Sequence, residues 1–120
     1  MKLTANQQAV LDELRKIGRA NFYRYRESCP HLHKEDCERA AKGDYECAFR
    51  LGGLSYQVGY RLKMSASAVL SIFKALERKG LVLRETYNPS YQRPLYWWPV
   101  GLAAELVSEK SCHQLMEASA

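Results

Sequence analysis

The chain has 120 residues, of which 47% are hydrophobic and 26% charged, and its formal net charge is +5. This composition excludes a wholly disordered chain, and the length suits one domain with one core. No apolar run approaches the roughly 20 residues that span a bilayer, and the first residues lack the apolar segment of a signal peptide. We therefore expect a cytoplasmic protein with no membrane partner, whose four cysteines are thiols or metal ligands rather than disulfides.

The first predicted element is an amphipathic helix over residues 4–17. Thr4 and Gln7 have the spacing of a capping box, and apolar residues including Val10 and Leu14 then recur at helical spacing. Gly18 is predicted to end this helix, because glycine commonly follows the last helical turn.

Residues 19–53 are predicted to form an insertion with short helices over 34–42 and 44–51. Five residues of this segment could ligate a metal: Cys29, His31, His33, Cys37 and Cys47. Three thiolates and one imidazole, with Cys29, Cys37, Cys47 and His33 as the candidate set, would close a tetrahedral zinc site. The segment has no C-x-x-C pair, so the alternative is buried cysteines beside exposed histidines. We expect no cofactor and keep a structural zinc ion as the alternative.

The segment LSYQVGYRLKMSASAVLSIFKALERKGLVLR, residues 54–84, predicts two helices joined by a tight turn at Lys63-Met64. Ser65 or Ser67 would cap the second helix, and Gly80 would end it. One core is predicted to combine the apolar residues of these helices with those of the first: Val10, Leu14, Val58, Leu62, Val69, Phe73, Leu76 and Leu81.

Two strands are predicted after Gly80, over residues 81–87 and 94–100, because both stretches are rich in β-branched and aromatic residues. The turn-prone sequence NPSYQR separates them. Trp97 and Trp98 are adjacent in the second strand, so their side chains should point to opposite faces. A short helix is expected over residues 101–110.

The excess positive charge lies entirely in residues 54–84. Six basic residues minus one acid give +5 for this segment, and 18 minus 13 give +5 for the whole chain. Phosphate neutralisation by basic residues supplies most non-specific affinity for nucleic acid. The segment is therefore a candidate DNA-binding element.

The stretch MSASAVLSIFKALERKGLV, residues 64–82, resembles the recognition-helix pattern of the winged helix-turn-helix superfamily of bacterial and phage regulators. The resemblance implies an α+β, mostly helical fold: a winged helix-turn-helix with an inserted helical segment between its first two core helices. The domain would cover residues 1–100 with the insertion at about 19–53, followed by a C-terminal helix and tail at 101–120.

The resemblance further implies a homodimeric transcriptional regulator, a repressor of phage or plasmid type, that binds double-stranded DNA sequence-specifically or semi-specifically. Arg93 would enter the minor groove from the wing tip. The predicted DNA-contacting residues are Lys63, Ser65, Ser67, Ser71, Lys74, Arg78, Arg84, Tyr91, Gln92 and Arg93.

An alternative function follows from the short side chains on the predicted groove face of the recognition helix. Ser67 and Ser71 stand where members of this superfamily often place Arg, Asn or Gln, the groups that read bases through paired hydrogen bonds. The chain could instead be a winged-helix interaction module that inhibits or regulates a host protein or nucleoprotein complex. No constellation of catalytic residues is present in the sequence, so an enzyme is not expected.

Overall fold

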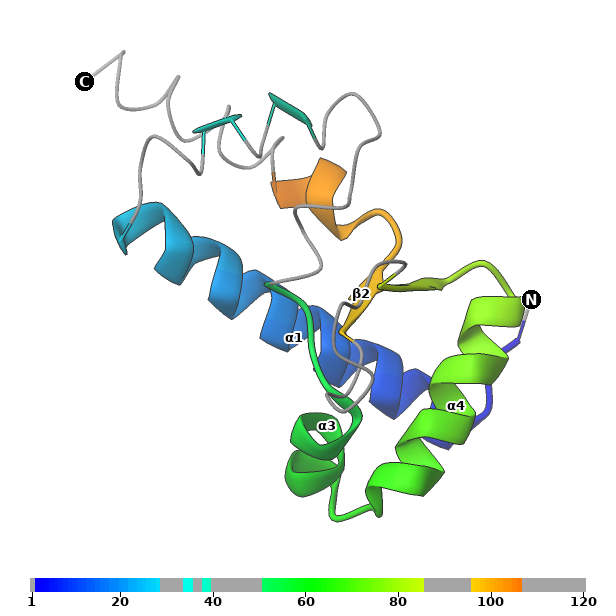
Figure 1. The fold of residues 1–120 in the computed structure, drawn as a ribbon. Helices are drawn as coiled ribbons and strands as arrows, with labels where there is room; N and C mark the ends of the chain where they lie inside the picture. The colour runs from blue at the N-terminus through cyan, green and yellow to red at the C-terminus, as the bar shows by residue number, and fades with distance from the viewer. Residues whose placement is uncertain (1, 29–33, 36–37, 40–50, 86–95, 107–120) are drawn as a thin grey trace.

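Helices and a small antiparallel sheet form the described part of the chain, which comprises residues 2–28, 34–35, 38–39, 51–85 and 96–106 of a computed structural model (Figure 1). The named elements are α1 (Ala5–Ser28), α3 (Ser55–Leu62), α4 (Ala66–Arg78), β1 (Val82–Arg84) and β2 (Trp97–Pro99). The predicted class, α+β and mostly helical, is confirmed. The helices expected over 34–42 and 44–51 fall largely outside the described residues.

Helix α1 begins as the sequence predicts but continues ten residues beyond Gly18, to Ser28. Thr4 and Gln7 form the capping box: each backbone N–H donates to the other residue's side-chain oxygen, both at 3.1 Å. The prediction that Gly18 ends the helix is wrong, because residues 19–28 continue α1. A Cβ atom at Gly18 would lie 2.7 Å from Leu102 Cδ2. Glycine is therefore used here for close packing inside a helix.

Strands β1 and β2 pair antiparallel, with Val82 opposite Pro99 and Arg84 opposite Trp97. Gly53 extends the sheet by one residue on the other side of β2. Its N–H donates to the Trp97 carbonyl at 3.0 Å, and the Trp97 N–H donates back at 2.9 Å. This bridge places the start of α3 beside the sheet.

The buried residues form two clusters on opposite sides of β2, as the alternation of Trp97 and Trp98 predicts. The larger cluster joins α1, α3, α4, β1 and β2: Val10, Leu14, Val58, Val69, Phe73, Leu76, Val82 and Trp97, with Leu62 and Leu81 packed against it. The predicted core is therefore confirmed. The smaller cluster contains Phe22, Trp98, Leu102, Ala103 and Leu106. Each tryptophan is only 1% exposed.

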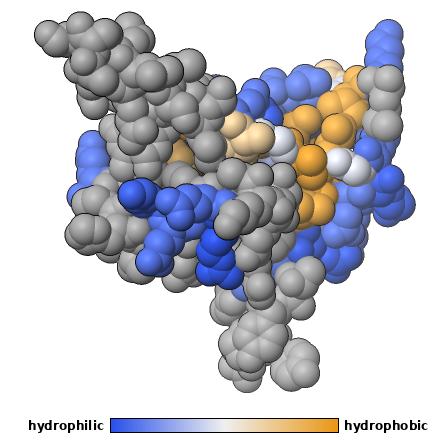
Figure 2. Space-filling view, turned by 90° about the horizontal axis from the view of Figure 1, so that it is seen from above, coloured by the Kyte–Doolittle hydropathy of each residue, from blue (hydrophilic) through white to orange (hydrophobic). Residues whose placement is uncertain are grey.

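Residues 102–106 are helical, in agreement with the short helix expected there, and they lie across α1 from α3 (Figure 1). Arg15 of α1 forms an ion pair with Glu105 of this turn. On the face seen in Figure 2, hydrophobic residues reach the surface in a band bordered by hydrophilic ones. None of the helices within the described residues has the length and apolarity to cross a membrane.

Candidate nucleic-acid interface

The connection between α3 and α4 is a tight turn that packs on the backbone of Gly59. The N–H groups of Lys63 and Met64 both donate to the Gly59 carbonyl, the second at 2.9 Å. A Cβ atom on Gly59 would lie 2.5 Å from the Met64 carbonyl oxygen. Lys63 takes the left-handed conformation, φ 56°, that reverses the chain. Gly59 thus fixes how α4 leaves α3.

Ser65 begins α4 as its N-cap. Its Oγ accepts a hydrogen bond from the Ala68 N–H at 3.1 Å and lies 3.4 Å from the Ser67 hydroxyl. Such a side chain satisfies one of the backbone donors left free at a helix start. Of the two serines proposed as caps, the structure therefore assigns the role to Ser65. Its predicted contact with phosphate remains a prediction.

One face of α4 is buried and the opposite face carries a continuous polar row. Val69, Phe73 and Leu76 face the larger core cluster. The exposed residues on the other side recur every three or four positions and define the α4 stripe: Ser67, Ser71, Lys74 and Arg78. Four of the residues predicted to contact DNA are thereby brought onto one surface of one helix.

The positive charges near the stripe differ in whether they are already paired. Lys63, Lys74 and Arg78 have no ion-pair partner within the described ranges. Arg61 Nε lies 3.4 Å from the Oε1 of Glu13, a buried acid on α1. The free positive charge of this region is therefore more concentrated on α4 and its preceding turn than residue counts alone indicate.

Arg84 is held by a carboxylate rather than left open to a ligand. Its Nη2 and Nε donate to the two carboxylate oxygens of Glu77 at 2.9 and 3.2 Å. The hydrogen bond to Glu77 is the main reason that the pKa of Arg84 is raised. The guanidinium carbon also lies 5.4 Å from the centre of the Trp97 ring. Arg84 therefore links β1 to α4, and a DNA phosphate would have to compete with the Glu77 carboxylate for its guanidinium group.

Several predicted site residues lie outside the described ranges. These are Tyr91, Gln92 and Arg93, together with the candidate metal ligands Cys29, His31, His33, Cys37 and Cys47. Within residues 2–28, 34–35, 38–39, 51–85 and 96–106, no group of three His, Cys, Asp or Glu residues could hold a metal ion.

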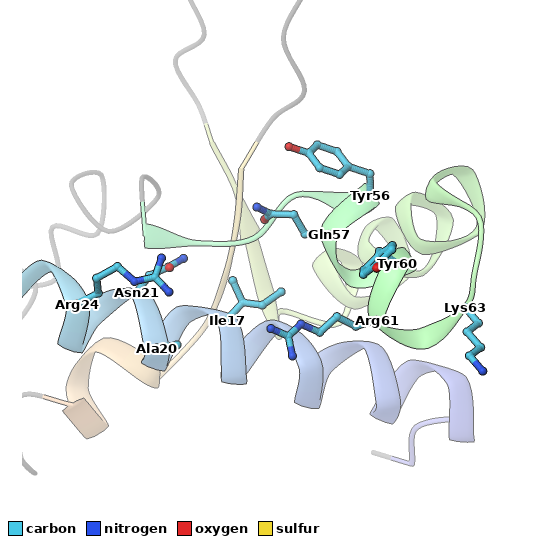
Figure 3. A pocket seen from close by; sticks show the side chains of 9 residues that line it. All are labelled: Ile17, Ala20, Asn21, Arg24, Tyr56, Gln57, Tyr60, Arg61 and Lys63. Carbon is cyan, nitrogen blue, oxygen red and sulfur yellow. The ribbon is translucent and has the colours of Figure 1, made fainter.

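A second surface, which the sequence analysis missed, is an open groove of about 1180 Å³ between α1 and α3 (Figure 3). We call it the α1–α3 groove; it is lined by Ile17, Ala20, Asn21, Arg24, Tyr56, Gln57, Tyr60, Arg61 and Lys63. Tyr56 is 54% exposed and Tyr60 is 89% exposed. The sequence could have indicated this surface, because the two tyrosines stand four residues apart, on the side of the helix away from Val58.

Comparison with known proteins finds no matching family model, curated protein or solved structure.

Proposed function

We propose that the chain is a winged helix-turn-helix protein that binds double-stranded DNA through the α4 stripe and acts as a transcriptional regulator. The order of α1, α3, turn, α4, β1 and β2 suits that fold. In it α4 would be the recognition helix and would lie in the major groove. The segment between β1 and β2 would form the wing.

One observation carries the proposal: Lys74 and Arg78 are exposed and unpaired on the same face of α4, among the described residues, and Lys63 precedes them in the turn. Cations that are already neutralised by a protein carboxylate release fewer counterions when they meet DNA. Unpaired lysine and arginine side chains contribute most to phosphate binding. The unpaired cations of α4 are therefore suited to binding the phosphates of duplex DNA.

The composition of the α4 stripe favours contact with the DNA backbone over base reading. Ser67 and Ser71 carry short hydroxyl groups, which can donate to phosphates but cannot make the two-point base contacts of Arg, Asn or Gln. Lys74 and Arg78 stand in the second half of the helix. We therefore propose semi-specific binding, in which phosphate contacts supply most of the affinity.

Two copies would bind together in the proposed mechanism. A homodimer places two recognition helices about 34 Å apart, one turn of the duplex, and so matches a pseudo-palindromic site. Occupying such a site in a promoter would block polymerase, which makes the protein a repressor. Helix α1 and the residues from 101 onward are the proposed dimer surfaces.

An electrophoretic mobility shift at low salt tests the proposal. The probes are a duplex from the region upstream of the protein's own coding sequence and a shuffled duplex of equal length and composition. We expect both duplexes to shift, with the upstream duplex bound more tightly. If neither duplex shifts at low salt, the proposal is wrong.

A second candidate function is a protein-interaction module that binds an acidic surface of a host protein. The short side chains of Ser67 and Ser71 favour it, because a helix that reads bases would be expected to carry longer polar groups there. The mobility shift separates the two candidates, since an acidic protein surface would be recognised without retention of DNA.

A further inference from the structure

The α1–α3 groove contains exposed aromatic rings that have no role in the proposed binding of duplex DNA. Tyr60 is 89% exposed and Tyr56 is 54% exposed, although tyrosine rings usually bury most of their apolar area. Both rings come from α3 and stand over the groove (Figure 3). None of the nine lining residues belongs to α4. The groove is therefore a surface separate from the α4 stripe.

The described residues that line the groove carry charge of one sign. They include Arg24, Arg61 and Lys63, and none of the nine is acidic. Glu13 contacts Arg61 from beneath at 3.4 Å and is buried, so it offsets part of one charge without facing the groove. Lys63 has no ion-pair partner within the described ranges. An anionic ligand with flat apolar faces is complementary to this combination.

We infer that the α1–α3 groove binds single-stranded DNA, with bases stacked on Tyr60 and Tyr56 and phosphates held by Lys63, whose charge is unpaired within the described ranges. A positive groove beside aromatic platforms is the general solution for binding single strands, because every base has a face that stacks. The inference of strand binding stands on the groove alone. The choice of DNA over RNA rests on the proposed function.

The spacing of the two rings favours an opened strand over a duplex. Residues four apart on a helix are separated by slightly more than one turn, or about 6 Å along the axis. Bases stacked in a duplex strand rise by only about 3.4 Å, and their faces cover one another. Two rings at the wider spacing can therefore each take a base only from a strand that is extended and unpaired.

Fluorescence anisotropy with a labelled oligothymidine of about 15 nucleotides tests stacking directly. Tyr60→Leu keeps an apolar side chain but removes the ring, and we expect it to weaken binding roughly tenfold. Tyr60→Phe keeps the ring and should bind as the unaltered protein does. Because Tyr60 is so exposed, neither change should impair folding, and circular dichroism checks this. Equal loss in both variants, or no loss in either, overturns the stacking assignment.

A pair of charge variants separates the groove from the α4 stripe. Lys63→Asn removes a groove charge with a residue that tolerates the left-handed conformation, and it should weaken oligothymidine binding. Lys74→Ala removes an equal charge from α4 and should leave oligothymidine binding unchanged while weakening duplex binding. If Lys74→Ala loses oligothymidine binding and Lys63→Asn does not, the single strand binds to α4 and the inference is overturned. If the protein binds oligothymidine but causes no mobility shift of duplex DNA, the proposed function is rejected and the inference about the groove stands.

Two competitors test the class of ligand. Oligouridine of the same length should compete less well than unlabelled oligothymidine, and a tighter uridine complex overturns the choice of DNA. Polyglutamate should displace the labelled strand only weakly, because it offers charge without stacking faces. Displacement by polyglutamate as effective as by oligothymidine would instead identify the groove as a site for acidic protein segments.

Discussion

Gly59 is the residue on which the geometry between α3 and α4 depends most. A Cβ atom there would meet the Met64 carbonyl oxygen at 2.5 Å, and a backbone group cannot move aside without shifting the turn. We expect Gly59→Ala to lower the free energy of unfolding by about 1–3 kcal/mol, the usual cost of overpacking. Urea denaturation followed by circular dichroism measures the change.

Gly18→Ala is the matched control for this prediction. Gly18 also lies inside a helix, and its added Cβ would meet Leu102 Cδ2 at 2.7 Å and the Trp98 ring at 3.1 Å. The atom met first is the end of a flexible side chain, which can rotate, and alanine favours the helix by about 1 kcal/mol over glycine. Gly18→Ala should therefore cost clearly less than Gly59→Ala. The reverse order would contradict the account of the turn.

At the residue scale, sequence reasoning identified which side chains are charged but not which charges are paired. Glu77 and Arg84 are seven positions apart, and their hydrogen bonds form only because β1 turns back along α4. Glu13 and Arg61 belong to different helices. Such pairs depend on the tertiary fold. A count of charged residues in the sequence therefore treats Arg61 and Arg84 as free, although both are partly neutralised in the structure.

At the scale of the element, helix α4 is started by a single side-chain hydrogen bond. Ser65→Ala removes the acceptor for the Ala68 N–H, which lies 3.1 Å from Oγ. We expect the loss to cost about 1 kcal/mol in the free energy of unfolding, as is typical of an N-cap serine. Thermal and urea unfolding of the purified variant give the value.

Ser67→Ala serves as the control for the cap, because Ser67 is exposed and lies in the first turn of the same helix. Its removal should change the free energy of unfolding by less than about 0.5 kcal/mol. Equal effects of the two alanine substitutions would show that Ser65 does not cap α4.

The elements themselves were predictable where local signals were complete. The apolar spacing of α3 and α4 and the stop at Gly80 placed both helices to within two residues of their ends. The end of α1 was not predictable, because Gly18 packs against Trp98 and Leu102 from the far end of the chain. A glycine chosen for close packing and a glycine that ends a helix look alike in a sequence.

At the scale of the whole molecule, the fold presents two differently built surfaces. The α4 stripe is a row of hydroxyls and free cations, whereas the α1–α3 groove combines exposed tyrosines with cations. The sequence indicated the first through its charge and helical spacing. The groove escaped prediction because it forms only where α3 lies against residues 17–24 of α1, a stretch that sequence reasoning had divided at Gly18.

The dependence of duplex affinity on salt tests the central claim, that α4 binds DNA phosphates, most directly. The logarithm of the binding constant should fall linearly with the logarithm of salt concentration. Each lost phosphate contact should flatten the slope by about 0.9. Lys74→Ala and Arg78→Ala should each flatten it by about that amount, whereas Lys34→Ala, which removes an exposed lysine outside both α4 and the proposed dimer surfaces, should leave it unchanged. Equal slopes in all four proteins would contradict the account.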